Sequence, residues 1–232
     1  MSLPEPLDAL VVAPHPDDAE LALGGTIARL LGAGWRVGVV DLTTGEPTPL
    51  GSEQTRARET QAATAVLGLS WRENLRLVNR SLVPDLEARR LLAGVFRRTR
   101  PRWVFAPYWL DAHPDHTAAS RLVEEARFWA KLSKSDLPGQ PHYPQRIWYY
   151  YSLHLRRVPD PLLVVDITPY WETKLQAVSS YRSQFVDPYP QGEFLQRMET
   201  QARFWGQMIG TQYGEPLTTR EVLGVEDFSG LI

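Results

Sequence analysis

The sequence predicts an α/β fold in three layers, with a mainly parallel central sheet. Short apolar segments alternate with longer segments whose apolar residues recur at helical spacing, and stretches rich in Gly or Pro separate them. Such alternation is typical of a parallel sheet that carries helices on its faces. No internal repeat, low-complexity tract or charge block interrupts the pattern. We therefore expect one domain over residues 1–232.

The pattern is clearest in the first half of the chain. Residues 7–13 form a nearly continuous apolar run, which suits a strand buried on both faces. After residues 14–18, apolar residues recur at helical spacing until Gly32 and Gly34 end the helix. The other elements predicted here are a strand over 35–42, a loop over 43–52, a helix over 53–67 closed by Gly68, a short strand near 75–78 and a helix from Pro84 or Asp85 to about Thr99.

The second half continues in the same order. A buried strand over 102–106 is followed by a loop over 107–116, and then by a helix with one apolar face. The remaining predictions are strands over 146–153 and 162–167 and helices over 169–183 and 192–209. This order of elements is that of a Rossmann-like three-layer sandwich.

The composition excludes several classes of function. The net charge is −2 and the pI about 6.2, so the chain has no basic footprint for nucleic acid. No apolar run approaches the roughly 18 residues that span a bilayer, and the first residues lack a basic region followed by an apolar core. We expect a cytoplasmic protein with no membrane partner. The chain has no cysteine, so His, Asp or Glu must hold any metal.

Two short segments carry the candidate chemistry: residues 15–18, which read His-Pro-Asp-Asp, and residues 113–116, which read His-Pro-Asp-His. Each follows a predicted strand and precedes a predicted helix. In a parallel sheet these positions lie at the carboxyl edge, where ligands bind. The two segments can therefore meet in one crevice.

The residue types in these segments suit metal-assisted hydrolysis. A catalytic zinc usually has three protein ligands and one open position, and two imidazoles with one carboxylate form such a set. Zinc lowers the pKa of water to around 7, and a nearby carboxylate can then take the proton. The spacing does not say which member binds metal. The plainer interpretation is a pair of ordinary turns, in which Asp caps the next helix. Two such segments at equivalent junctions favour a site.

At these residues the sequence resembles the LmbE-like, PIG-L-type family of N-acetylglucosamine deacetylases. It is most similar to the bacillithiol-biosynthesis members, the N-acetylglucosaminyl malate deacetylases. The resemblance implies the LmbE-like deacetylase fold and covers nearly the whole chain. The residues that carry it are 14–18, Gly24-Gly25 and 113–116, with support from 40–43, 72–75, 164–167, 181–185 and 213–216.

The resemblance also implies a role for each member of the two segments. His15, Asp18 and His116 would bind zinc, and such ligands also accept Fe²⁺, Mn²⁺ or Co²⁺. Asp17 would be the general base. His113 would be the charged or proton-donating partner that stabilises the tetrahedral intermediate, oriented by Asp115.

Further residues are implied at the substrate. Arg56 would contact the substrate, Glu46 would help to hold the sugar, and Tyr213 would assist at the oxyanion. Taken alone, Arg56 also fits a solvated helix residue, Glu46 a surface charge and Tyr213 a packing residue. Two positions depart from the subfamily: Ala112 stands where Arg is common, which bears on malate recognition, and Asn79 stands where Asp is common. Asn79 can still hydrogen-bond a sugar hydroxyl.

The sequence thus predicts a zinc-dependent N-deacetylase that acts on the acetamide of a small N-acetylglucosamine conjugate. The preferred substrate is N-acetylglucosaminyl malate, and the resemblance implies a homo-oligomer such as a hexamer. The alternatives are an amidase for another N-acetylglucosamine or thiol conjugate, and a sugar- or nucleotide-binding module without catalysis. His142 and His154 lie outside the two segments and are interpreted as surface or structural residues.

Overall fold

A mostly parallel sheet of seven strands forms the centre of the computed structural model, which describes residues 5–155 and 159–224. The strand order is β3-β2-β1-β4-β5-β7-β6, and only β7 runs antiparallel to its neighbours. The strands are β1 (Ala9–Ala13), β2 (Val37–Thr43), β3 (Trp71–Leu77), β4 (Trp103–Pro107), β5 (Arg146–Tyr150), β6 (Leu163–Asp166) and β7 (Gly214–Thr218). The predicted α/β class with a mainly parallel sheet is confirmed.

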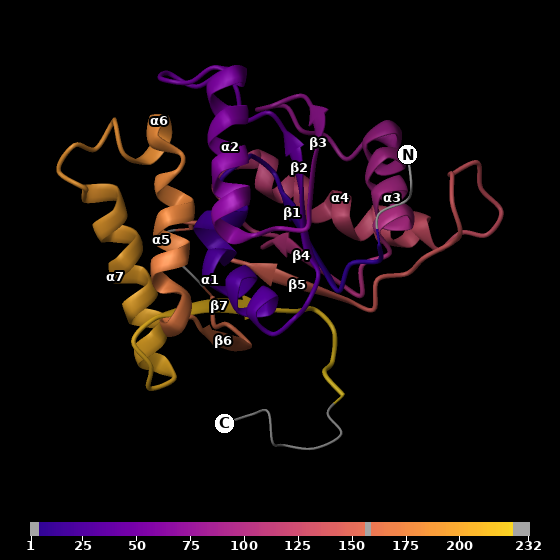
Figure 1. Ribbon diagram of the computed structural model, residues 1–232. Helices are drawn as coiled ribbons and strands as arrows, with labels where there is room; N and C mark the ends of the chain where they lie inside the picture. The colour runs from indigo at the N-terminus through magenta and orange to yellow at the C-terminus, as the bar shows by residue number, and fades with distance from the viewer. Residues whose placement is uncertain (1–4, 156–158, 225–232) are drawn as a thin grey trace.

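Helices cover both faces of this sheet, as Figure 1 shows. One face carries α3 and α4, which pack against each other, and the other carries α1, α2 and α5. The helices are α1 (Asp18–Gly32), α2 (Glu53–Leu67), α3 (Leu86–Thr99), α4 (Pro114–Ala130), the 3₁₀ turn η1 (Thr168–Tyr170), α5 (Trp171–Ser179), α6 (Arg182–Phe185) and α7 (Glu193–Met208). No helix in the described ranges is long and apolar enough to cross a bilayer.

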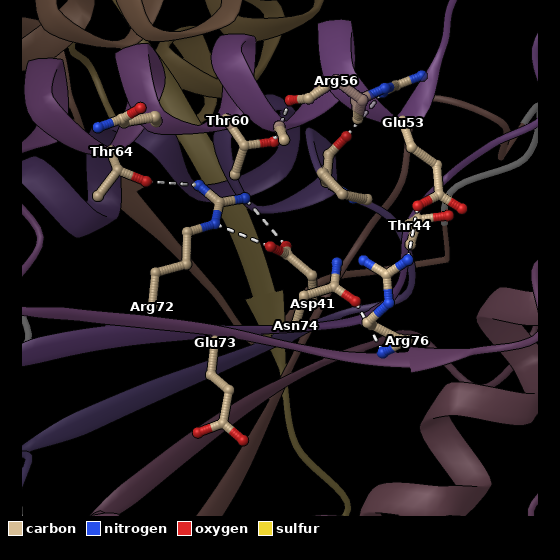
Figure 2. Close-up of a pocket in the computed structure, with 13 residues that line it drawn as sticks. Asp41, Thr44, Glu53, Arg56, Thr60, Thr64, Arg72, Glu73, Asn74 and Arg76 are labelled. Atoms are coloured by element: carbon tan, nitrogen blue, oxygen red, sulfur yellow. Dashed lines mark hydrogen bonds and ion pairs between the residues drawn. The ribbon is translucent and has the colours of Figure 1, made fainter. Parts of the chain in front are cut away.

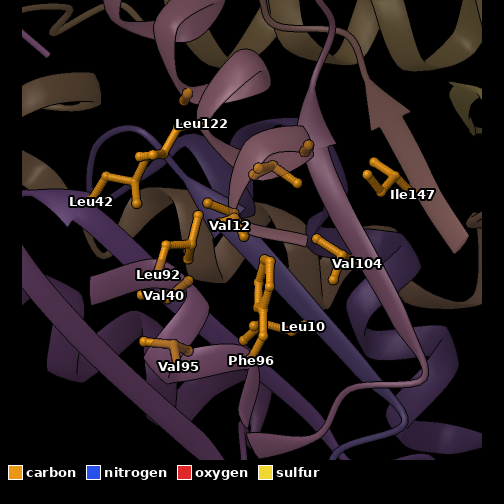
Figure 3. Packing of buried hydrophobic residues seen from close by; sticks show 14 of the residues in the cluster. Leu10, Val12, Val40, Leu42, Leu92, Val95, Phe96, Val104, Leu122 and Ile147 are labelled. Carbon is orange, nitrogen blue, oxygen red and sulfur yellow. The ribbon is translucent and has the colours of Figure 1, made fainter. Parts of the chain in front are cut away.

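The period of two in a strand divides the core between the two faces of the sheet. In β1, Leu10 and Val12 join the cluster under α3 and α4, where Phe96 and Leu122 also pack (Figure 3). Ala9, Val11 and Ala13 of the same strand point to the opposite face and pack under α1 and α5. Because both faces of β1 are buried, its sequence reads as the continuous apolar run that predicted it.

Five details differ from the prediction. The strand predicted near 75–78 is β3, which begins at Trp71, and the strand predicted over 146–153 ends at Tyr150. The segment 169–183 is divided among η1, α5 and the start of α6. Helix α4 begins inside the predicted loop, because Pro114 suits the first helical position and the His113 ring accepts from the Asp115 amide at 3.2 Å. Strand β7 was not predicted.

Helix α1 packs very closely on the segment that follows β6. A Cβ atom added at Gly25 would lie 2.5 Å from Cβ of Ile167, so only glycine fits there. The carboxylate of Glu215, on β7, accepts from the amides of Gly25 at 3.0 Å and Thr26 at 2.7 Å, and from Lys174 Nζ at 2.6 Å. These bonds fix the position of α1, whose first residue is Asp18.

Candidate metal centre and active site

The two His-Pro-Asp segments meet at the carboxyl edge of the sheet. Strands β1 and β4 are neighbours, and the two segments lie in the connections from β1 to α1 and from β4 to α4. The ring of His15 lies 4.7 Å from that of His113 and 5.5 Å from that of His116, centroid to centroid. The predicted convergence of the two segments is therefore observed.

Three side chains form a group that could hold a metal ion: His15, Asp18 and His116. Oδ2 of Asp18 lies 3.1 Å from Nδ1 of His15 and 3.4 Å from Nε2 of His116. That His116 nitrogen is buried and has no hydrogen-bond partner among the described residues. An unpartnered imidazole nitrogen beside a carboxylate and a second imidazole fits a zinc-type ligand set.

His15 and His116 each contact a second carboxylate through the ring nitrogen that does not face Asp18. Nε2 of His15 lies 3.0 Å from Oδ2 of Asp115, and Nδ1 of His116 lies 3.0 Å from Oδ2 of Asp111. The Ser152 hydroxyl in turn donates to Asp111. Outer carboxylates of this kind fix the orientation and tautomer of metal-binding histidines. Each ring thus has one nitrogen toward Asp18 and the other toward a supporting carboxylate.

His15 also belongs to an overlapping group, with His113 and Asp115. The Asp115 carboxylate, however, already accepts from the amides of Arg80 at 2.8 Å and Leu82 at 3.1 Å as well as from His15. With three donors around it, Asp115 is better placed to support His15 than to bind metal itself.

The carboxylates of this site favour the protonated, positively charged forms of His15 and His116. Burial lowers the pKa of His15, but its hydrogen bonds to Asp115 and Asp18 outweigh burial and raise the pKa to about 9. Burial likewise disfavours the charged form of His116, while Asp18 and Asp111 raise its pKa to about 10. The pKa of Asp18 is lowered because the two histidines outweigh its burial. Carboxylates that draw protons onto both rings would also attract a metal cation.

Asp17 lies beside the ligand group and has an unusual main-chain conformation, with φ of 124° and ψ of −28°. Nη1 of Arg56 donates to the Asp17 carboxylate and, at 2.8 Å, to the carbonyl of Pro16. Burial raises the pKa of Asp17 to about 7, against the opposing effect of Arg56 and with a further rise from Asp18. A carboxylate with a pKa near neutrality suits a general base.

Arg56 and Glu46 are buried partners of each other. Nη2 of Arg56 lies 3.4 Å from Oε1 of Glu46, and their side chains are 4% and 5% exposed. Glu46 also accepts from the amide of Thr48 at 2.7 Å. The interpretations of Arg56 as a solvated residue and Glu46 as a surface charge are therefore wrong. Arg56 lines the pocket beside the ligand group, whereas Glu46 is not among the described lining residues.

The pocket has a volume of about 320 Å³, at the lower end of the range for small-molecule sites. It brings together most of the predicted site residues: His15, Asp17, Asp18, Arg56, Asn79 and His113. His116, Asp111 and Asp115 do not line it but contact the side chains of the metal group. Six of the predicted site residues thus line one cavity.

Among the ionisable side chains that line this pocket, sequence reasoning missed two, Arg80 and His154. His154 is exposed, as its interpretation as a surface residue expected, but its ring lies 5.7 Å from that of His113 and 5.6 Å from that of His116, so it also belongs to the site. A signal was available, because His154 follows a third parallel strand, β5, at the same edge of the sheet. No sequence pattern indicated that Arg80 belongs to the site, apart from its position next to the predicted residue Asn79.

Asp115 contacts His113 in a different way from the prediction. The carboxylate of Asp115 is directed to His15, and the main-chain amide of Asp115 donates to Nδ1 of His113. Asp115 therefore orients His113 through its backbone, and its side chain supports a metal-group histidine instead.

Tyr213 is not brought to the site. Its hydroxyl bonds with Glu199 at 2.9 Å and with Arg203 at 2.8 Å, and its ring stacks on Trp171 with centroids 4.4 Å apart. It lies just before β7 in a cluster that packs under α7, and it does not line the described pocket. The predicted role at the oxyanion is corrected to a packing role.

We therefore expect Tyr213→Phe to leave kcat and KM within about twofold of wild type, because it removes only the hydroxyl. Two part-exposed hydrogen bonds are lost, so the free energy of unfolding should fall by roughly 1–2 kcal/mol. Steady-state kinetics and denaturant unfolding measure both effects. A large loss of kcat with unchanged stability would return Tyr213 to the chemistry.

A second cavity, of about 330 Å³, lies between α2 and β3 on the other side of Arg56 (Figure 2). Its charged groups are already paired. Arg72 donates to both oxygens of Asp41 at 2.9 Å, and Arg76 donates to Glu53 at 2.6 Å. Among the residues that the structure describes, no group of potential metal ligands lies in this cavity, so the chemistry is assigned to the pocket around His15.

Comparison with known proteins agrees with this geometry. The family model described as GlcNAc-PI de-N-acetylase (PIG-L) matches residues 10–127. The diacetylchitobiose deacetylase of Thermococcus kodakarensis is 33% identical over 228 residues, which cover 89% of this chain and 80% of that protein. The crystal structure of the conserved protein TT1542 from Thermus thermophilus is 41% identical, with a TM-score of 0.87, over 95% of this chain and 98% of that one.

Two more distant relatives have other named activities. A Bacillus anthracis protein named as a probable N-acetyl-alpha-D-glucosaminyl L-malate deacetylase is 26% identical, over 76% of this chain and 81% of its own length. The 4-oxalmesaconate hydratase of Pseudomonas putida is 28% identical, over 76% and 73%. Similarity of this degree therefore spans two types of reaction.

Proposed function

The chain belongs to the PIG-L (GlcNAc-PI de-N-acetylase) family, and we propose that it is a zinc-dependent N-deacetylase of an N-acetylglucosamine conjugate. One observation carries the proposal. Two imidazole nitrogens face one carboxylate oxygen of Asp18, and a separate carboxylate, Asp17, lies beside them in the same pocket. Metal-assisted hydrolysis of an amide uses side chains that bind the metal and a separate carboxylate that takes the proton of the water.

His15, Asp18 and His116 would hold the metal. When bound there, zinc supplies a Lewis acid that lowers the pKa of water and polarises the acetamide carbonyl. Iron, manganese and cobalt fit the same nitrogen and oxygen donors. Asp111 and Asp115 keep the two rings oriented from behind.

Asp17 takes the proton of the attacking water on its carboxylate. Arg56 holds that carboxylate in place, and the pKa near 7 keeps it able to accept a proton at neutral pH. His113 acts on the opposite side of the reaction. Its Nδ1 accepts from the Asp115 amide, so a neutral ring carries its proton on Nε2, which can donate to the oxyanion or to the departing amine. The products are acetate and a free amine.

For the substrate, we propose N-acetylglucosaminyl malate, in the pathway to bacillithiol. The resemblance of the two motifs to the malate deacetylases and the likeness to the Bacillus anthracis protein support it. A second candidate is N,N′-diacetylchitobiose, which the 33% identity to the Thermococcus kodakarensis deacetylase favours. The predicted homo-oligomer stays a prediction.

The test is amine release from N-acetylglucosaminyl malate, N,N′-diacetylchitobiose and N-acetylglucosamine. Zinc-loaded and chelator-treated protein are compared on each compound. We expect zinc-dependent release of amine, with the malate conjugate preferred by kcat/KM. Preference for diacetylchitobiose would replace the substrate and keep the reaction. If no compound releases amine while 4-oxalmesaconate is hydrated, the deacetylase proposal is wrong and the hydratase relative is the better guide.

A further inference from the structure

Two loops meet at the rim of the pocket that holds the candidate metal group. One contributes Gly45, Pro47 and Thr48, and the other contributes Asn79 and Arg80. The guanidinium of Arg80 joins them by donating to the carbonyl of Pro47. The Arg80 side chain is exposed and lines the pocket, so a ligand in the pocket can reach it.

The main chain at Arg80 is fixed to the metal group. Its amide donates to Oδ2 of Asp115 at 2.8 Å, and the same carboxylate oxygen supports His15. The Asn79 side chain accepts from the same amide at 3.0 Å. The base of the Arg80 side chain is therefore held at a set position relative to the reacting end of the pocket.

Some charged side chains of the pocket have an oppositely charged partner, and in the described part of the chain Arg80 does not. Arg56 is paired with Asp17 and Glu46, and His15 and His116 face the carboxylates described above. Arg80 has no carboxylate within 4.0 Å among residues 5–155 and 159–224, and its known acceptor is a neutral carbonyl. It is thus a guanidinium without a counter-ion at the mouth of a pocket. Guanidinium groups bind carboxylates and phosphates through paired, charge-assisted hydrogen bonds.

We propose that Arg80 is a specificity residue that binds an anionic group, carboxylate or phosphate, on the part of the substrate attached to the amino sugar. The proposal rests on the proposed deacetylase function for its substrate and names the class of conjugate that this pocket selects. Neutral conjugates would leave Arg80 without a partner, and anionic conjugates would form an ion pair at the rim.

Binding is measured first, by calorimetry, on zinc-loaded protein that carries Asp17→Asn and does not turn the probes over. The probes are N-acetylglucosaminyl malate as the carboxylate, N-acetylglucosamine 1-phosphate as the phosphate and N,N′-diacetylchitobiose as the neutral sugar. We expect at least one anionic probe to bind about tenfold more tightly than the neutral probe, with a preference that falls as salt is added. The tighter anion identifies which of the two groups the site accepts.

Arg80→Gln should remove that preference, because glutamine keeps a polar side chain with an amide donor but carries no charge. The matched control is Arg76→Gln. Arg76 also has a left-handed main chain, with φ of 54° against 63° at Arg80, but it is paired with Glu53 and does not line this pocket. The control should keep the preference, which excludes a general effect of net charge.

In steady-state kinetics, Arg80→Gln should raise KM for the preferred anionic substrate about tenfold and leave kcat and the neutral substrate unchanged. Equal or absent binding of the anionic probes, or a preference that survives Arg80→Gln, overturns the proposal. Anion preference in a protein that releases no amine would keep the role of Arg80 and remove the deacetylase function, so the two failures are distinct.

Discussion

Replacing Asp17 with asparagine is expected to lower kcat by about 10²–10⁴-fold without removing the metal, because the side chain keeps its shape and loses its base. Asparagine still accepts a hydrogen bond from Arg56, and it tolerates a positive φ better than most residues. Steady-state amine release gives kcat, and elemental analysis of the same sample gives the metal content.

The control for this substitution is Asp187→Asn. Asp187 is 55% exposed and pairs with Arg182, away from the pocket, so its loss should leave kcat and metal content unchanged. If Asp17→Asn loses metal in parallel with activity, Asp17 is a ligand and the general base must be sought elsewhere. If it keeps both, amide hydrolysis in this pocket does not use Asp17.

The second large effect is expected for His116→Gln, which should abolish zinc binding. Nε2 of His116 is the buried nitrogen that faces Asp18 and has no hydrogen-bond partner in residues 5–155 and 159–224, and glutamine offers neither its basicity nor its geometry. Wild-type protein at a zinc concentration about 100 times the Kd should gain roughly 2.7 kcal/mol of stability, which raises Tm by about 5–10 °C. The variant should show no zinc-dependent rise.

His142→Gln is the control, because His142 contacts the Pro101 carbonyl at 2.8 Å and belongs to neither metal group. It should keep the full zinc-dependent rise in Tm. The readout does not depend on turnover, so it separates a lost metal site from a lost substrate. A zinc-dependent Tm rise that persists in His116→Gln would exclude the assignment of His15, Asp18 and His116 as the ligand set.

The parts of the fold that the sequence predicted are those with strong local patterns. The buried strand β1 and the apolar faces of α1 and α4 are encoded by short-range periodicity. Strand β7 lacks such a pattern, because its five residues include Gly214 and Pro216, and its pairing with β5 and β6 depends on distant segments. The antiparallel strand in the sheet therefore became visible only in three dimensions.

The candidate site also has one part that the sequence predicted and one part that it did not. The two His-Pro-Asp segments could be predicted, since each lies at a strand-to-helix junction and carries several ligand-type residues. The side chains that contact these residues could not be predicted from the sequence. Arg56 faces Asp17 across a separation of 39 residues, and Asp115 faces His15 across 100. The predicted role of Tyr213 at the oxyanion was wrong for the same reason. The position of Tyr213 in the sequence does not show that its hydroxyl is directed toward α7.

The bonds from Glu215 to the amides of α1 also bear on the order in which the protein is made. Gly25 and Glu215 are separated by 190 residues, so a ribosome adding ~5–20 residues per second needs about 10–40 s between them. Once His116 has been added, the nascent chain contains all three candidate metal ligands but not yet the carboxylate of Glu215 that accepts from the α1 amides. We expect the cavity to gain its final shape, and to retain metal, only once this late strand has left the ribosome.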